Sequence, residues 1–489
     1  MESSLDCDLV VYTVSRLHIT SQVIGKGRLL IQKAVSRDYP TIEVGCPPKP
    51  WKLGLLAIVI GSTAGFLCTT IEGAVILTLI LCLSVYGLVI AVHSSSTPLL
   101  LVGFLPVITR MVPYDLQPRL LIMFLILAVT TFLLSIKYNG VLRLPSRTLR
   151  RPLLAFSAWM IFSSGLSANA ASSLPLSLGM TVSILAFTMI VCTTTTRTRH
   201  VVHILYIVTL LGLVCIMFQG IVFLTGRPLF VFGKQFSVYT LTKGMPRFRA
   251  VFPNSNWFGS LLLYSLGSAV SVTLYSRKTG RRTTLRYVIP ILVIGLIFTL
   301  SRSSLVGALV CIFTAYWLES KTKALVAIMV TAVVGVGAIF LYPPLAEAVI
   351  RFDVGLAGRE VLWPVGLELF ATHPVTGIGF GTWISLPRGA RTLHNAYLQI
   401  LAELGLPGLL LMMWLLLGWL RGALCAVSTR RDTPESALLA GIIGVIAGAA
   451  TQQLFESFGL GRAQFFDMYF LLFLVLGAII SSKLASLCR

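Results

Sequence analysis

The sequence predicts an all-α protein, a polytopic transmembrane helical bundle of about 12–14 spans with a long extracytoplasmic loop that contains short helices. Two observations carry this prediction. The 489 residues are 56% hydrophobic and only 11% charged, whereas soluble globular proteins carry about 25% charged residues. Apolar stretches close to the length that crosses a bilayer as a helix also recur along the chain. We therefore expect a multi-pass membrane protein.

The amino-terminal part, residues 1–51, precedes the first apolar stretch. It mixes short apolar runs such as LVVY with basic residues, and it lacks the apolar core and small-residue cleavage site of a signal peptide. We expect this part to be a cytoplasmic extension.

The apolar stretches that follow predict transmembrane helices of about 20 residues each. The predicted spans are 52–69, 73–92, 97–112, 118–136, 152–169, 175–194, 201–223, 257–275, 286–300, 304–319, 324–341, 396–420, 437–457 and 464–482. The interval 342–395 is far longer than an ordinary connection of about 4–6 residues and is therefore a candidate functional loop. The expected domains are the extension 1–51, a transmembrane region 52–341, an extracytoplasmic catalytic loop 342–395 and carboxy-terminal transmembrane helices 396–489.

Basic residues on short loops orient the bundle, because cytoplasmic loops carry an excess of Lys and Arg. The basic loops alternate correctly, at 137–151, 197–199, 277–286, 321–323, 421–431 and 483–489. This pattern predicts a protein of the cytoplasmic (inner) membrane with both termini in the cytoplasm. The net charge of +22 then mainly reflects the basic cytoplasmic loops, whose Lys and Arg side chains also contact anionic membrane lipids. We expect no nucleic-acid partner.

Two outer segments carry positive charge against this bias. Residues 224–256 contain Arg227, Lys234, Lys243, Arg247 and Arg249, the later loop contains Arg351, Arg359, Arg388 and Arg391, and Arg302 lies between two spans at the same level. A charged side chain near a bilayer is usually functional or paired with an opposite charge. The planar guanidinium of arginine matches the geometry of phosphate oxygens. We expect an anionic ligand such as a pyrophosphate at the outer face. Pairing with loop acids or lipid phosphates is the alternative.

His394 stands at the start of the span that follows the loop, close to Arg388 and Arg391 in the sequence. The free N–H groups at a helix start disfavour a protonated imidazole. A neutral His394 is therefore a candidate proton acceptor. A histidine that only caps the span is the alternative.

A polar stripe descends from this point, because Asn395, Gln399 and Glu403 follow one another at i+4 spacing. An acidic group at this depth must face the bundle interior, and we expect Glu403 to give structural support rather than to catalyse. Gln452 and Glu456 repeat the spacing in the next span and are expected to line the same cavity.

Aromatic residues gather at the same face, namely Phe252, Trp257, Trp363, Trp383 and Tyr397. An interfacial aromatic belt explains such a gathering, and sugar rings also stack on aromatic faces. The rings permit a glycan ligand without demanding one.

Other common sites are not expected. The nine cysteines avoid the long outer loops, which argues against a disulfide framework, and neither zinc-ligand spacing nor a phosphate-binding GxxxxGK[ST] run occurs. The GIGFG run at 377–381 lacks the spacing of a dinucleotide site and is expected to form tight turns. We predict no metal and no cofactor.

The motifs RFRAVFPNSNWFG at 247–259, LSRSS at 300–304, GREVLW at 358–363, HPVTGIGFGTW at 373–383 and HNAYLQILAELGLPG at 394–408 follow in this order. Together they resemble the superfamily of bacterial O-antigen ligases and Wzy-type O-antigen polymerases. Two departures stand out. The glycine common soon after the first family arginine is absent from RAVF, and more spans are predicted than ligases have.

The resemblance implies a metal-independent glycosyltransferase that takes a glycan from an undecaprenyl pyrophosphate-linked donor outside the cytoplasmic membrane. The acceptor is a glycan or glycolipid, either lipid A core or another lipid-linked repeat, or a protein in related oligosaccharyltransferases. By motif position the family arginines correspond to Arg249 or Arg247, Arg302 and Arg359, and the loop histidine to His394. The expected catalytic residues are His394, Arg359 and Arg302, and the expected substrate-binding residues are Arg247, Arg249, Asn254, Arg388, Arg391, Asn395, Trp363 and Glu456.

The predicted reaction is a single displacement with inversion, in which arginines stabilise the leaving pyrophosphate and His394 accepts the acceptor proton. The amphipathic stretch Leu362, Val365 and Leu369 is expected in the loop that covers the substrates. A small-anion transporter and a catalytically silent glycan-binding protein are the alternatives from other classes. Ligase and polymerase remain equally open.

Overall fold

The computed structural model describes residues 41–43, 141–225, 229–231, 234–236, 239–242, 245–250, 252, 254–281, 283–322, 324, 326, 359–382, 392–457 and 468–486. Within these residues the helices are α7 (Arg147–Gly165), α8 (Ala170–Thr194), α9 (Thr198–Thr225), α10 (Ser255–Lys278), α11 (Leu285–Phe298), α12 (Arg302–Glu319), α15 (Arg359–Thr372), α16 (Ala396–Thr429), α17 (Pro434–Gln452) and α18 (Met468–Ser486). The predicted spans before residue 141 and the predicted span 324–341 lie outside the described helices, and so does the extension 1–51 apart from residues 41–43.

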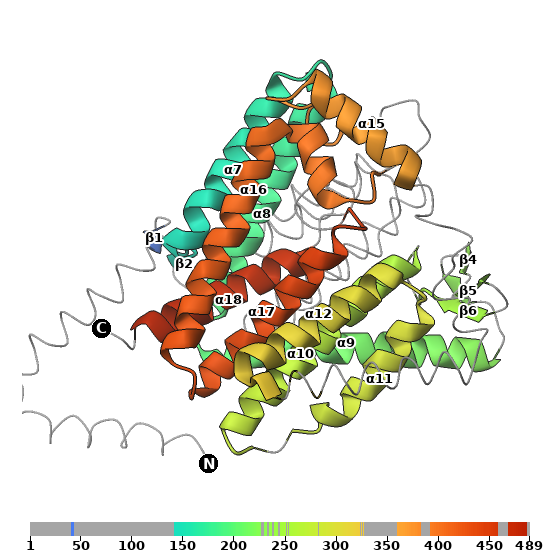
Figure 1. Cartoon of the computed structure of the whole chain (residues 1–489), viewed down its shortest axis with the longest axis vertical. Coiled ribbons are helices and arrows are strands. Elements are labelled where there is room, and N and C mark those ends of the chain that lie inside the picture. The colour runs from blue at the N-terminus through green and yellow to red at the C-terminus, as the bar shows by residue number, and fades with distance from the viewer. Residues whose placement is uncertain are drawn as a thin grey trace, which may run out of the picture.

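Each predicted span between residues 152 and 319, and each after residue 396, coincides with a helix, which confirms an all-α polytopic bundle (Figure 1). Six of the described helices, α8, α9, α10, α16, α17 and α18, are long and apolar enough to cross a membrane. Several predicted ends were wrong, among them both ends of α7, which spans Arg147–Gly165 instead of 152–169. Helix α16 continues from residue 420 to Thr429, because a helix needs no apolar residues once it leaves the bilayer, and α17 ends at Gln452 instead of residue 457.

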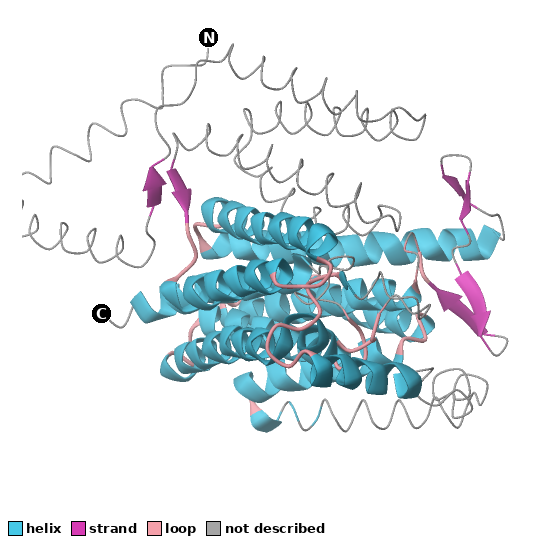
Figure 2. Ribbon diagram, turned by 90° about the horizontal axis from the view of Figure 1, so that it is seen from above, coloured by secondary structure: helices cyan, strands magenta, loops and turns pink. Residues whose placement is uncertain are grey.

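Three short antiparallel strand pairs accompany the described helices and were not predicted. Strand β1 (Thr41–Glu43) pairs with β2 (Val141–Arg143), β3 (Leu229–Val231) with β4 (Lys234–Phe236), and β5 (Tyr239–Thr242) with β6 (Met245–Phe248). Figure 2 shows the helices running alongside one another, with the β1–β2 pair near one end of the bundle and the other two strand pairs near the opposite end.

Small residues let the central helices approach closely. Helix α10 is buried along its length, and α12 packs along α17. A Cβ atom at Gly307 of α12 would lie 2.7 Å from the carbonyl oxygen of Gly448 in α17, and one at Gly448 would lie 2.3 Å from the carbonyl oxygen of Gly307. Close backbone contact at small residues is typical of helices that pack within a membrane.

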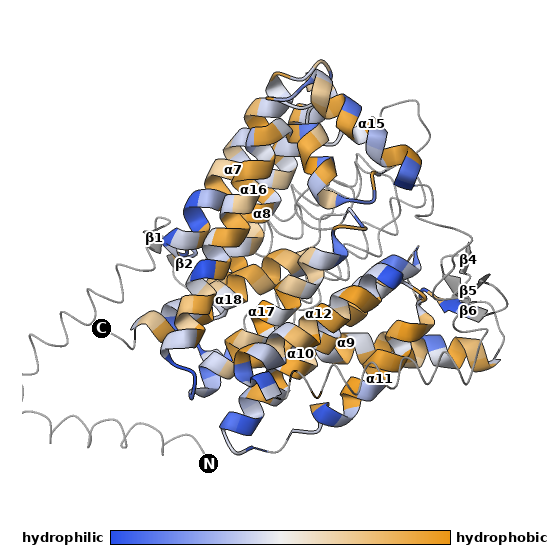
Figure 3. Ribbon diagram, in the orientation of Figure 1, coloured by the Kyte–Doolittle hydropathy of each residue, from blue (hydrophilic) through white to orange (hydrophobic). Residues whose placement is uncertain are grey.

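The outer helices expose large apolar side chains, as a lipid-facing surface requires. On α9 the exposed residues are Leu210, Val214, Met217 and Ile221. Their spacing of three or four residues places them on one helix face. Figure 3 shows apolar residues along the helices and hydrophilic residues mainly toward helix ends.

Ion pairs join helix ends at the side that the sequence assigns to the cytoplasm. Lys483 Nζ of α18 lies 2.9 Å from Glu435 Oε1 of α17 and also donates to Thr198 Oγ1 of α9. Lys278 Nζ of α10 lies 3.7 Å from Asp432 Oδ1, which precedes α17. Four elements therefore meet at this end, and the predicted site residues that the structure describes lie at the other.

Candidate active site

The carboxylate of Glu456 contacts three side chains, of which two belong to predicted site residues. Arg359 Nη2 lies 3.1 Å from Glu456 Oε1, and His394 Nδ1 lies 3.1 Å from Glu456 Oε2. Asn256 Nδ2 also donates to Glu456 Oε1, at 2.5 Å. The side chain of Glu456 is only 3% exposed, and such a buried carboxylate is stabilised only when it is paired and hydrogen-bonded. Glu456 is therefore the centre of a cluster that draws residues from four separate parts of the chain.

Arg247 joins the same cluster through Asn256. Its Nη2 donates to Asn256 Oδ1 at 3.0 Å, and its Nε donates to the carbonyl oxygen of Thr299 at 3.2 Å. The Asn256 amide thus connects Arg247 to Glu456. Arg249 lies two residues further along, and its carbonyl oxygen accepts a hydrogen bond from Phe252 N.

Arg359 is the first residue of α15 and ties this loop helix to the turn after α17. Its Nη2 and Nε donate to the carbonyl oxygen of Phe455 at 2.8 and 3.2 Å, beside the ion pair with Glu456. The amphipathic face of α15, Leu362, Val365 and Leu369, packs against Leu393 and Ala402 next to the start of α16 (Figure 1). Helix α15 is thereby anchored at both its first residue and its apolar face.

Arg302 is the first residue of α12, and the first turn of this helix is fixed to α17. Ser304 Oγ accepts a hydrogen bond from Gln452 Nε2 at 2.7 Å and lies 2.8 Å from Ser301 Oγ. Gly259 of α10 makes room for this contact, because a Cβ there would lie 2.5 Å from Ser304 Oγ. Helix α12 therefore begins, with Arg302, at the end of the bundle that contains Gln452 and Glu456.

Strained backbone marks the same region. Among the described residues, the non-glycine residues with positive φ are Ala250 (48°), Leu300 (49°) and His394 (51°). Each is a predicted site residue or stands within two residues of Arg249 or Arg302. This conformation costs about 1–3 kcal/mol per residue and is concentrated at functional sites in proteins. The strain supports the location of the site independently of the ion pairs.

His394 lies just outside the helix that it was predicted to begin. Helix α16 begins at Ala396, and Asn395 is its N-cap, with Asn395 Oδ1 accepting from Leu398 N at 3.0 Å. The left-handed φ of His394 keeps this residue outside the helix, because an α-helix cannot include that conformation, and α16 begins two residues later, at Ala396. His394 still faces Glu456 from this position.

The HPVTGIGFGT segment forms the predicted tight turns, with positive φ at Gly377, Gly379 and Gly381. The turns lie against a break in α16 at Gly405, where the φ of 69° interrupts the helix. Ile378 N and Gly379 N donate to the carbonyl oxygens of Ala402 and Glu403. The carbonyls that the break leaves free are thus satisfied, as buried backbone in a membrane requires.

Two of the predicted substrate-binding residues make hydrogen bonds to the backbone. Asn254 is the N-cap of α10, and its Oδ1 accepts from Asn256 N at 2.8 Å. Trp363 Nε1 donates to the carbonyl oxygen of Leu393 at 3.1 Å, directly before His394. Arg388 and Arg391 lie outside the described residues. Glu456 was expected on the same helix face as Gln452, one turn further along the span. Helix α17 ends at Gln452, however, and Glu456 lies in the turn that follows.

Sequence reasoning missed Asn256 and Gln453. Asn256 joins Arg247 to Glu456, although it was only one letter of the PNSNW motif. Gln453 is the C-cap of α17, 2% exposed, and its Nε2 makes no hydrogen bond. Its carbonyl oxygen accepts from Ala396 N at 2.9 Å, next to the Asn395 cap. A buried amide donor without a partner is rare, but nothing in the local sequence around QQLFES distinguishes it.

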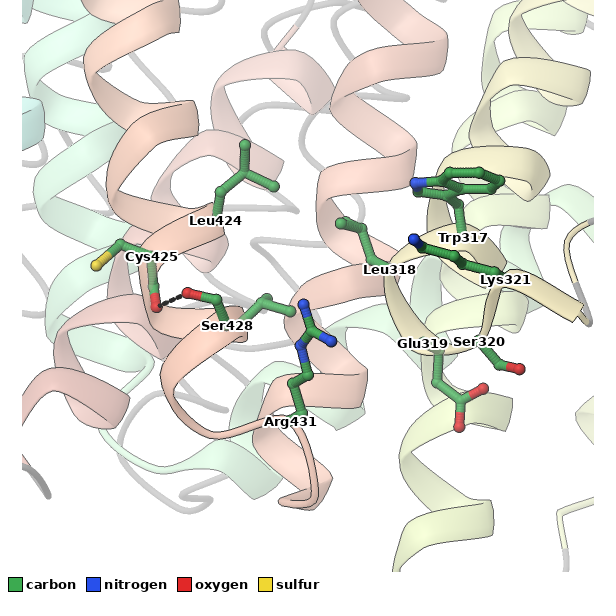
Figure 4. Close-up of a pocket in the computed structure, with 10 residues that line it drawn as sticks. Trp317, Leu318, Glu319, Ser320, Lys321, Leu424, Cys425, Ser428 and Arg431 are labelled. Carbon is green, nitrogen blue, oxygen red and sulfur yellow. Dashed lines mark hydrogen bonds between the residues drawn. The ribbon is translucent and has the colours of Figure 1, made fainter.

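A cavity of about 480 Å³ lies at the other end of α16 (Figure 4). Its lining includes Trp317, Lys321, Leu424, Ser428 and Arg431. The walls are the final turns of α12 and α16, and carboxyl-terminal helix ends favour cations rather than anions. Lys321 and Arg431 complement these ends, and the cavity is separate from the Glu456 cluster.

Within the residues that the structure describes, no three His, Cys, Asp or Glu side chains gather in a way that could hold a metal ion. Residues 287–413 match the family model described as O-antigen ligase. The matched segment contains Arg302, Arg359 and His394, and it supports the superfamily that the motifs indicated. No curated protein matches the chain.

Proposed function

We propose that this chain, a multi-pass membrane protein with an O-antigen ligase domain, is a glycosyltransferase of cell-surface polysaccharide biosynthesis. It moves a glycan from an undecaprenyl pyrophosphate-linked donor to lipid A core or to another lipid-linked repeat, at the outer face of the cytoplasmic membrane. The observation that best supports this function is the Glu456 cluster, which joins His394, Arg359 and, through Asn256, Arg247 at one end of the bundle.

In this proposal the arginines bind the pyrophosphate of the donor. The bond between the anomeric carbon and the phosphate oxygen breaks, and its electron pair moves to the pyrophosphate. Guanidinium groups placed before the reaction stabilise that growing negative charge. Arg359 and Arg302 act on the leaving group without a metal ion, while Arg247 and Arg249 bind the donor.

His394 accepts the proton of the acceptor hydroxyl as the new glycosidic bond forms. With Nδ1–H donated to Glu456 Oε2, at 3.1 Å, the lone pair of the neutral ring lies on Nε2. A carboxylate that orients a histidine in this way fixes its tautomer and ring orientation. Attack from the face opposite the pyrophosphate inverts the anomeric centre.

The test is transfer by the purified protein in nanodiscs with undecaprenyl pyrophosphate-linked repeats, without added metal or ATP. His394→Ala is expected to lower the rate about 10²–10⁴-fold, and Arg359→Ala about 10²–10³-fold. Arg431→Ala, which changes an arginine at the far end of α16, is the matched control and should retain the wild-type rate.

The products separate the remaining possibilities. A ladder of lengthening glycans indicates a polymerase, and one addition to lipid A core indicates a ligase. Wild-type transfer by His394→Ala would contradict the assigned site. Absence of transfer to either acceptor, together with anion flux into proteoliposomes, would contradict the enzyme and favour the transporter.

A further inference from the structure

Two buried polar residues below His394 are not part of the Glu456 cluster. Gln399 is fully buried and Glu403 is 1% exposed, both on the first two turns of α16. A buried carboxylate at this depth is retained only where hydrogen bonds hold it. Their contacts therefore indicate what these two side chains do.

The contacts form a relay between two backbone N–H groups. Leu393 N donates to Gln399 Oε1 at 3.1 Å, Gln399 Nε2 donates to Glu403 Oε1 at 2.5 Å, and Gly381 N donates to Glu403 Oε2 at 3.0 Å. Each step has one possible direction. The Gln399 amide accepts from Leu393 through its oxygen and donates to Glu403 through its nitrogen, and the two Glu403 oxygens accept from Gln399 and Gly381.

The relay ends at the residue before the strained histidine. Leu393 is fully buried, its N–H is held by Gln399, and its carbonyl oxygen is held by Trp363 Nε1. With both polar groups of Leu393 fixed, the peptide that leads into His394 has a defined orientation. A non-glycine residue keeps a left-handed φ only when its surroundings determine it.

We infer that Gln399 and Glu403 are positioning residues for His394, which hold the Leu393–His394 peptide so that the imidazole meets Glu456. The inference rests on the proposed function, in which His394 accepts the acceptor proton. A small displacement of such a group costs about 10²-fold in rate.

The test compares Gln399→Met, which keeps the side-chain length and removes the relay, with Glu403→Gln, which replaces one accepting oxygen by a donating NH₂ group. Both are expected to lower kcat about 10–100-fold and to change the KM for the donor less than threefold. Trp419→Phe is the matched control, because it removes a buried hydrogen bond from α16 to the Leu474 carbonyl oxygen far from His394. It should lower Tm about as much as Gln399→Met and leave kcat unchanged.

A double-mutant cycle separates positioning from a general structural role. In a His394→Ala background, Gln399→Met should lower the residual rate less than twofold. The inference is overturned if Gln399→Met keeps the wild-type kcat, or if it lowers the rate equally in both backgrounds. If His394→Ala itself keeps the wild-type rate, the proposed function fails first. If His394→Ala lowers the transfer rate strongly and Gln399→Met does not lower it, the positioning role is wrong while the proposed function stands.

Discussion

At the scale of single residues, the site depends on one carboxylate that serves several partners. Glu456 accepts from Arg359 and Asn256 on one oxygen and meets His394 on the other. The charge keeps Arg359 in place, and the second oxygen orients the imidazole. Neither task requires Glu456 to touch the substrate, so its loss should affect turnover through Arg359 and His394.

Glu456→Gln tests this role. The amide keeps the shape and some hydrogen bonds but loses the charge, and we expect transfer to fall about 10–100-fold, as when the group that orients a functional histidine is removed. Initial rates at saturating donor measure the effect. Thr451→Val, which removes a nearby hydroxyl bonded to the Ala447 carbonyl oxygen within its own helix, is the control and should keep the rate. A Glu456→Gln rate equal to wild type would contradict the orienting role.

At the scale of elements, the site depends on how closely three helices pack. Helix α12, which starts with Arg302, contacts α17 through Gly307 and Gly448, and its first turn contacts α10 through Gly259. Helix α15 instead uses apolar side chains against the start of α16. The turn that carries Glu456 follows α17 directly, so the spacing of α12 and α17 sets the distance between Arg302 and the cluster.

Gly307→Ala tests the close packing of α12 and α17. The new Cβ would lie 2.6 Å from Leu263 Cδ1 and 2.7 Å from the Gly448 carbonyl oxygen, so we expect a loss of about 1–3 kcal/mol in the free energy of unfolding. Transfer should fall as well, because Arg302 moves with α12. Gly179→Ala in α8 has open space and should stabilise the protein by up to about 1 kcal/mol. Unfolding in detergent measures the stability of the Gly307→Ala and Gly179→Ala variants. Equal stabilities would contradict the tight contact between α12 and α17.

At the scale of the whole molecule, the two ends of the bundle differ in chemistry. One end carries the ion pairs of Lys483 with Glu435 and of Lys278 with Asp432. The other carries the Glu456 cluster and the strained backbone. Helix α16 runs from one to the other, so a membrane around the bundle must leave these ends on opposite sides.

Thiol labelling tests which end faces outward. In a cysteine-free background, Thr372→Cys at the exposed end of α15 should react with a membrane-impermeant maleimide in intact spheroplasts, because basic loops stay in the cytoplasm. Asp432→Cys, at a fully exposed position beside Lys278, should react only after permeabilisation. The reverse pattern would invert the predicted topology and move the site to the cytoplasm.

The helices were predictable because the constraint on them is local. A segment that crosses a bilayer must satisfy its backbone groups within itself, so apolar length alone located α8 to α12 and α16 to α18. The ends were less predictable. Hydropathy does not report that α17 stops at Gln452, nor that His394 takes a left-handed φ before α16 begins.

The sequence by itself determined the membrane class, the order of the spans and the motifs that carry Arg302, Arg359 and His394. Only the tertiary structure decided that Glu456 is the common partner of Arg359, His394 and Asn256, and that Gln399 and Glu403 bind the backbone around His394. The physical reason is distance along the chain. Asn256 and Glu456 are brought together by the packing of α10 beside α17, and no periodicity within a single segment records which helices become neighbours.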